Sequence, residues 1–280
     1  MQRSPLSRRA GDRSQHAIAA AGIAISMLII GACAGDTAEG TLSDAVEASD
    51  EEVARALLAT GADPDEPRTT GLTPLMRAAA RDDASMAEVL LGGGADLEAT
   101  DPAGLTPAHV AAQANSAATL EVLVAAGADL AATSSDGFAA IHHAAALGSV
   151  EVIEILHSLG TDIDARSEAT TQGHGYPRDV GPTALSVAVR AGQITAAEML
   201  LALGAEVDAA SDAGHTPLLV AVFSSQSPEV VALLLAAGAD PRIQVPCERG
   251  CSAPTGDALQ WAVELDRSDL VPLLGDAAGP

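Results

Sequence analysis

The chain has 280 residues and a formal net charge of −24 near neutral pH, and arginine supplies all 14 of its basic side chains. Such an acidic chain is not expected to bind nucleic acid or anionic lipid headgroups through electrostatic attraction. Aromatic residues make up only 1% of the sequence. Alanine, leucine, valine and isoleucine must therefore build the core, which favours many thin, closely packed layers over one large globular core.

The N-terminal segment predicts export from the cytoplasm. A basic start is followed by an uncharged apolar run from Ala17 to Ile30 and then by Gly31-Ala32-Cys33. A basic region, a short apolar region and small residues before a cleavage point are typical of a secretory signal. The alternative is an uncleaved membrane anchor, because Ala17–Ala34 reaches the lower length limit of a spanning helix. Both interpretations place the rest of the chain outside the cytoplasm.

Residues Ile30-Gly31-Ala32-Cys33 resemble the bacterial lipobox. The resemblance implies that residues 1–33 form a lipoprotein signal, that the chain is cut before Cys33, and that the thiol of Cys33 carries the lipid. Residues 34–40 are then a short linker. Position 34 is alanine and not the aspartate associated with inner-membrane retention, so the resemblance favours outer-membrane attachment facing the periplasm. Inner-membrane attachment and secretion are the alternatives.

A repeat of 33 residues occupies the rest of the chain. Glycine-led phrases begin at Gly71, Gly104, Gly137, Gly181 and Gly214, in steps of 33, 33, 44 and 33 residues. The second phrase predicts a helix over 108–114, a small turn, a second helix over 118–125 and a left-handed glycine cap at 127. Two such short helices cannot bury their apolar faces alone, so the units must stack on one another.

The phrases Thr106-Pro107-Ala108-His109 and Leu234-Leu235-Ala236-Ala237-Gly238-Ala239-Asp240 resemble the ankyrin repeat. The resemblance implies an all-α solenoid of helix-turn-helix units with projecting β-turns or hairpin loops, extending over residues 41–276. Its units are an N-terminal cap at 41–66, repeats at 69–101, 102–134, 135–178, 179–211 and 212–255, and a C-terminal cap at 256–276.

Two insertions interrupt the repeats, at 167–180 and 241–255. The first contains His174 and the only tyrosine, Tyr176. Insertions in repeat proteins collect on one face, often the binding face, although a neutral loop extension is the alternative. The second contains Cys247 and Cys251, which in an oxidising compartment predict a structural disulfide. A redox dithiol usually has a different spacing, and a zinc site would need further ligands.

His109 and His142 occupy the histidine position of the ankyrin pattern. We expect each ring to form hydrogen bonds with neighbouring turns and so to brace the stack. A zinc cluster of His142, His143 and His157 is disfavoured, because consecutive residues on a helix point to different faces.

The ankyrin pattern also indicates which residues face the groove, namely the residue after each leading glycine and the end of each first helix. The partner-binding residues predicted from this pattern and from the first insertion are Phe138, Leu147, His174, Tyr176, Arg190, His215 and Phe223. The alternative for Phe138 is that its ring packs against its own repeat. Trp261 is expected to close the core at the C-terminal end.

The resemblance implies a non-catalytic module that binds a protein or peptide through the groove and the inserted loops. We expect a monomer that needs no cofactor or metal and meets the membrane only through its lipid. The alternative is an envelope enzyme or small-ligand binder with a site around His174 and Tyr176. No glycine-rich phosphate loop, metal signature or Ser-His-Asp arrangement in the sequence supports catalysis.

Replacing Cys33 with serine is expected to block lipid attachment and processing, because serine has no thiol to modify. Incorporation of radiolabelled fatty acid into wild type and Cys33→Ser measures this directly. Continued labelling of the variant would contradict the lipobox prediction.

Overall fold

The computed structural model describes residues 40–168, 181–224, 227–246 and 255–278. These residues form pairs of short antiparallel helices, each pair being one unit of the predicted repeat. The predicted all-α repeat fold is confirmed. None of the helices in the described ranges is both long enough and apolar enough to cross a membrane.

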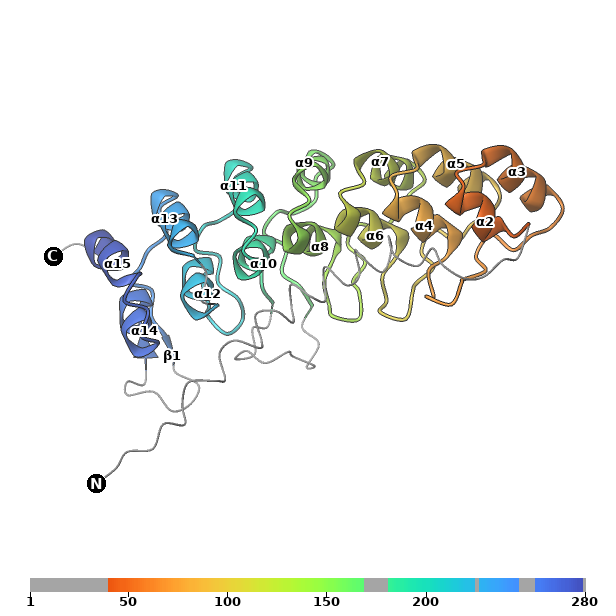
Figure 1. The fold of residues 1–280 in the computed structure, drawn as a ribbon. Helices are drawn as coiled ribbons and strands as arrows, with labels where there is room; N and C mark the ends of the chain where they lie inside the picture. Colours follow the sequence, from red (N-terminus) through yellow and green to blue (C-terminus); the bar gives the residue numbers. More distant parts are fainter. Residues whose placement is uncertain (1–39, 169–180, 225–226, 247–254, 279–280) are drawn as a thin grey trace, which may run out of the picture. The chain divides into compact units, whose positions relative to one another are not determined.

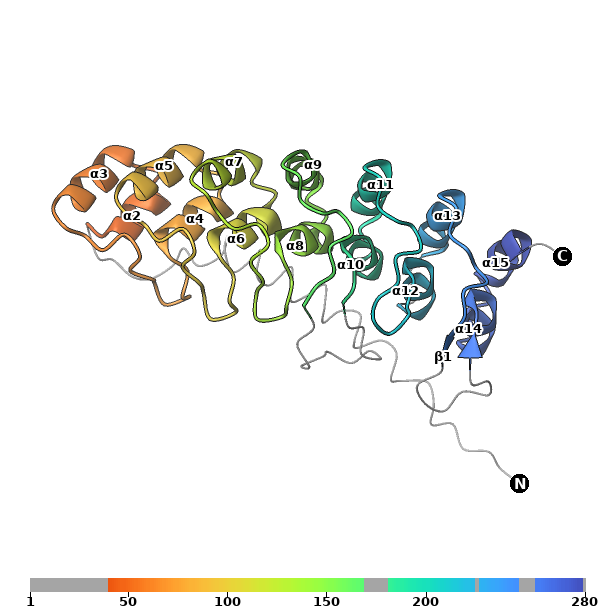
Figure 2. The same ribbon diagram turned by 180° about the vertical axis from the view of Figure 1, so that it is seen from behind.

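The helices form two layers, as Figures 1 and 2 show from opposite sides. The first helices of the units, which we call the first-helix layer, are α2 (Leu42–Glu47), α4 (Pro74–Ala80), α6 (Pro107–Ala114), α8 (Ala140–Leu147), α10 (Ala184–Ala191), α12 (Pro217–Phe223) and α14 (Ala258–Glu264). The second-helix layer consists of α3 (Glu51–Ala59), α5 (Ala84–Gly92), α7 (Ala117–Ala125), α9 (Val150–Ser158), α11 (Ile194–Ala202), α13 (Pro228–Ala236) and α15 (Val271–Ala278). Each first helix contacts the first helix of the next unit.

The Thr-Pro pairs of the repeat start the first helices. The Thr73 side chain accepts a hydrogen bond from the amide of Met76, and Thr216 does the same for Leu219. This bond satisfies one of the amides that the first turn of a helix leaves without a partner. Pro74 occupies the first turn, where its missing N–H costs nothing and its fixed φ suits the helix.

Glycines with positive φ end the helices and let the turns stack. Gly127 follows α7 with a φ of 100°, as predicted. Gly137 has a φ of 78°, and a Cβ atom there would lie 1.4 Å from the carbonyl oxygen of Glu168. The Glu168 amide donates to the Gly137 carbonyl at 2.8 Å. Only glycine fits at this point, because a side chain would push successive turns apart.

Alanine controls the spacing of the first-helix layer. Positions in a first helix are counted from its N-cap residue, so that +1 is the first helical residue. Position +5 is a fully buried alanine in six units, at Ala78, Ala111, Ala144, Ala188, Ala221 and Ala262. A side chain this small allows neighbouring helices to approach closely, and larger buried residues such as Leu75, Ile141 and Leu185 fill the space beside it.

Short backbone pairings flank the two insertions. Strand β1 (Val245–Pro246) pairs antiparallel with β2 (Thr255–Gly256), and an isolated bridge joins Arg166 to Thr183. The first pairing leads into α14 and the second into α10, so both insertions enter the stack just before a first helix. The inserted residues 169–180 and 247–254 lie outside the described ranges.

Candidate partner-binding face

The first-helix face consists of positions +4, +7 and +8 of the first helices together with the turns that precede these helices. At two junctions the residue at +7 contacts the residue at +4 of the next unit. The amide Nε2 of Gln113 lies 3.1 Å from Nδ1 of His143, and the ring centroids of Phe223 and Trp261 lie 5.3 Å apart. Three clusters of side chains result, one charged, one of histidines and one aromatic.

The charged cluster lies at the N-terminal end of this face. Arg77 of α4 pairs with Glu47 at the end of α2, and Arg81 reaches the other oxygen of the same carboxylate at 3.4 Å. Arg68 pairs with Asp44. Hydrogen bonds from Thr41, followed by the pairing with Arg68, hold the pKa of Asp44 below its ordinary value. These charges join the first two units of the stack.

The histidine cluster confirms the structural role predicted for His109 and His142. The Thr106 amide donates to Nδ1 of His109 at 3.1 Å, so Nε2 carries the proton and faces the Phe138 carbonyl at 3.1 Å. His142 likewise reaches the Ala165 carbonyl at 3.0 Å. Burial lowers the pKa of both rings, and the carbonyl contacts only partly oppose this. Both histidines therefore stay neutral and tie a first helix to the next turn.

His143, which is partly exposed, belongs to the same cluster. Its Nδ1 faces Gln113, its Nε2 lies 3.1 Å from the hydroxyl of Ser134, and its ring meets that of His109 edge-on at 5.2 Å. Burial, together with the nearby His109 and His142 rings, lowers the pKa of His143 to about 3. A proton on this ring is therefore strongly disfavoured in the folded protein.

Phe138 packs against its own unit, as the alternative interpretation of this residue held. Its ring stacks on His142 with centroids 5.6 Å apart and meets His143 edge-on at 5.9 Å. The ring remains partly exposed. It can therefore contact a partner with its outer side while the inner side holds the histidines in place.

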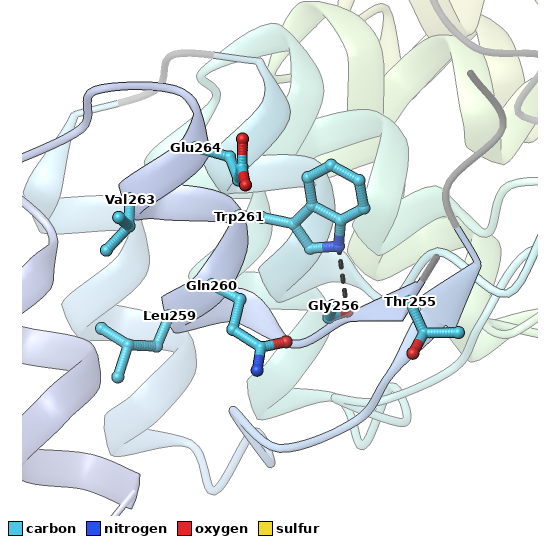
Figure 3. A pocket seen from close by; sticks show the side chains of 7 residues that line it. All are labelled: Thr255, Gly256, Leu259, Gln260, Trp261, Val263 and Glu264. Atoms are coloured by element: carbon cyan, nitrogen blue, oxygen red, sulfur yellow. Dashed lines mark hydrogen bonds between the residues drawn. The ribbon is translucent and has the colours of Figure 1, made fainter. Parts of the chain in front are cut away.

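The aromatic cluster lies toward the C-terminal end. His215 is only 5% exposed and its ring packs on Phe223 at 5.4 Å, so it supports Phe223 and offers little surface of its own. Trp261 donates from Nε1 to the Gly256 carbonyl at 2.9 Å. Trp261 also lines a hollow of about 400 Å³. Figure 3 shows the side chains around it. The residues around this hollow are Thr255, Gly256, Leu259, Gln260, Trp261, Val263 and Glu264.

The remaining predicted site residues fall into two groups. Leu147 and Arg190 are partly exposed at or near the C-terminal ends of α8 and α10. Five others lie outside the described ranges, namely Cys33, His174, Tyr176, Cys247 and Cys251. Within the described part of the chain, no three His, Cys, Asp or Glu residues are grouped so that they could hold a metal ion.

A second kind of contact between units was not expected from the sequence. The Asp82 carboxylate accepts from the Thr119 amide at 2.9 Å, and the Asn115 side chain accepts from the Val152 amide at 3.3 Å. Both acceptors have left-handed backbones and stand 33 residues apart. Each side chain therefore caps the second helix of the following unit. The sequence feature that could have predicted these caps is that both residues occupy the same position in the repeat.

Known proteins share this arrangement. A family model described as ankyrin repeats (three copies) matches residues 42–134, 75–167 and 168–245. The chain is a member of the ankyrin repeat family. Ankyrin repeat domains generally mediate protein–protein interactions, which directs attention to the accessible side chains of the first-helix face.

Two solved ankyrin repeat domains are similar over most of the chain. That of Bcl-3, described as a unique member of the IkappaB protein family, is 26% identical with a TM-score of 0.67 and covers 86% of this chain and 100% of its own. That of human ASB11 is 26% identical with a TM-score of 0.64 and covers 85% of this chain and 98% of its own. No curated protein matches the chain.

Acid is expected to destabilise this ankyrin stack partly through His143. The folded pKa of about 3 lies below the ordinary 6.5. Protonation therefore favours the unfolded chain, and stability is lost as the pH falls from about 6.5 toward 3. Between pH 7 and pH 5 this one ring accounts for a loss of about 2 kcal/mol.

Denaturant unfolding of wild type and His143→Val near pH 7 and near pH 5 measures this contribution. Valine is the residue at the same position in the two neighbouring units, at Val110 and Val187. The variant should lose less stability than wild type between the two pH values. An identical loss in both proteins would contradict the role assigned to His143.

Proposed function

We propose that this ankyrin protein is a non-catalytic interaction module, tethered in the bacterial envelope, that binds a protein or peptide partner on its first-helix face. The observation that carries the proposal is the composition of that face. Phe138, Leu147, Arg190 and Phe223 remain partly exposed in three consecutive units, in a chain whose buried core consists mostly of alanine and aliphatic residues. Aromatic and arginine side chains are the usual energetic anchors of protein interfaces.

The clustering of these residues also supports a binding role. Phe138 is held by two histidine rings, and Phe223 is held between His215 and Trp261. Side chains that are fixed before a partner arrives lose little conformational freedom on binding. The partner therefore meets two rigid aromatic points, one in the unit on each side of α10, with Arg190 on α10 itself.

The envelope location is part of the proposal and is supported by the sequence. In this account residues 1–33 direct export, Cys33 carries the lipid, and the chain faces the periplasm from the outer membrane. A disulfide between Cys247 and Cys251 then stiffens the second insertion. These residues lie outside the described ranges, as do His174 and Tyr176, so the alternative of a catalytic or small-ligand site at 167–180 also stays a prediction.

Crosslinking of the exported protein in intact envelopes tests the binding face, with Leu147→Glu compared with Leu159→Glu. Leu147 ends a first helix, whereas Leu159 follows the second helix of the same unit and is 47% exposed. A buried charge in an apolar contact opposes binding. Recovery of a stoichiometric partner should therefore fall about tenfold with Leu147→Glu and stay unchanged with Leu159→Glu.

Circular dichroism of both variants verifies that the helices are intact, and Leu147→Ala provides a milder change at the same position. Equal recovery with both glutamate variants would contradict binding at the first-helix face. Turnover of a small substrate that is lost on changing His174, without a stoichiometric partner, would favour the enzyme alternative.

A further inference from the structure

The last described first helix, α14, carries apolar side chains at positions that the five preceding units bury. At +2 and +6 the side chains in α4, α6, α8, α10 and α12 are at most 2% exposed. They are Leu75, Ala108, Ile141, Leu185 and Leu218 at +2, and Ala79, Ala112, Ala145, Val189 and Val222 at +6. In α14 the corresponding Leu259 is partly exposed and Val263 is 63% exposed.

The exposure of these side chains in α14 has a simple cause, because no first helix of a next unit covers them among the described residues. Each earlier first helix is covered by the first helix of the next unit. The contact of α14 with its own second helix, α15, is like that in the earlier units, where each first helix packs on the second helix of the same unit. No described residue takes the place of a next first helix beside α14. The exposed part of Leu259 and Val263 is therefore the area that one more helix covers elsewhere in the stack.

The open surface, which we call the C-terminal face, consists of Leu259, Val263 and Glu264 of α14, followed by Asp266 just after the helix. Glu264 and Asp266 are both exposed. Leu259, Val263 and Glu264 line the hollow of about 400 Å³ beside Trp261, as Figure 3 shows. Contiguous apolar side chains with a polar rim are typical of a protein interaction site.

Two carboxylates on this face, those of Glu264 and Asp266, occupy repeat positions whose side chains contact the next unit elsewhere in the stack. Glu264 is at +7, the position from which Gln113 and Phe223 reach the next first helix. At the first junction the residue at the end of α2 is also a glutamate, Glu47, and it pairs with Arg77 at +4 of α4. A helix seated beside α14 would therefore place its own +4 residue opposite Glu264, where a cation fits.

Asp266 repeats a second junction contact. Its φ of 58° matches those of Asp82 and Asn115, which occupy the same phase of the repeat. The side chains of these two residues accept from the amides of Thr119 and Val152, in the first turn of the next second helix. Among the described residues, the carboxylates of Glu264 and Asp266 accept no such bond.

We propose that the C-terminal face docks a basic amphipathic helix of a partner protein, in the place where a further unit would stack. The apolar side of that helix covers Leu259 and Val263, and an arginine or lysine pairs with Glu264. Charge complementarity selects this occupant over a second copy, because a symmetric contact between two copies would bring acidic rims, including Glu264 and Asp266, together. The face is separate from the groove residues Leu147 and Arg190.

Titration with a synthetic helix tests this docking, and Trp261 reports it because it is the only tryptophan of the chain. The probe is an amphipathic peptide of about 18 residues, with leucines on one side and arginines beside them. A matched peptide carries glutamate in place of each arginine. The arginine peptide should change the Trp261 emission saturably, and the glutamate peptide should bind at least about tenfold more weakly.

Variants at exposed positions separate docking from nonspecific charge attraction. Val263→Asp should weaken the arginine peptide about tenfold or more, whereas Val53→Asp, at a 42% exposed valine of α3, should not. Glu264→Lys should weaken the arginine peptide and strengthen the glutamate peptide, each by roughly three- to tenfold.

Three results would overturn the proposal. One is equal binding of the two peptides, and another is equal weakening by Val263→Asp and Val53→Asp. The third is a concentration-dependent dimer in sedimentation that Val263→Asp abolishes, since the occupant would then be a second copy. The groove residues Leu147 and Arg190 are unchanged in all of these experiments. Partner binding in the groove can therefore fail or succeed whatever the result at the C-terminal face.

Discussion

Each unit of this stack completes its packing and its hydrogen bonds on the unit that follows it. His109 reaches the carbonyl of Phe138, Asn115 caps the helix that contains Val152, and Gly137 leaves room for the backbone of Glu168. A single unit has too little apolar surface to fold alone, so these forward contacts are what make the array stable. Among the described first helices, α14 has no following first helix packed against it, and its Val263 is 63% exposed.

The same constraint accounts for part of the acidity of the chain. Asp65, Glu98 and Asp208 each accept a hydrogen bond from a backbone amide in the closing turn one unit further along. Across the first insertion, Asp164 accepts a hydrogen bond from the amide of Glu206 at 3.0 Å. Carboxylates in these turns therefore act as acceptors that join units, in addition to contributing to the net charge of −24.

The sequence predicts local features of the fold well, because a few residues determine them. Thr-Pro pairs mark helix starts, glycines mark left-handed caps, and His109 and His142 serve as braces as predicted. The contact of Gln113 with His143 and the hollow beside Trp261 depend instead on how neighbouring helices align, which no single repeat specifies. His215, in contrast, is buried within its own unit, where its ring packs on that of Phe223.

The predictions of surface residues also differ in how far the repeat pattern alone determines them. The ankyrin pattern correctly places Leu147, Arg190 and Phe223 near the ends of first helices, where each stays partly exposed. The ring of Phe138 packs on His142 and His143 of its own unit, as the alternative interpretation held, and it stays partly exposed, while its role in partner binding stays a prediction. The two insertions have no repeat partner to align with, so their roles cannot be inferred from the stack.

The most direct test of forward coupling is amide hydrogen exchange in the full chain carrying Asn115→Gly. Glycine keeps the left-handed backbone, as at Gly148 and Gly192 in the next two units, and removes only the side-chain acceptor. Exchange should accelerate about fivefold or more at Val152 and the first turn of α9, while α4 and α5 of the preceding unit stay unchanged. Acceleration confined to the preceding unit, or none in α9, would contradict the account.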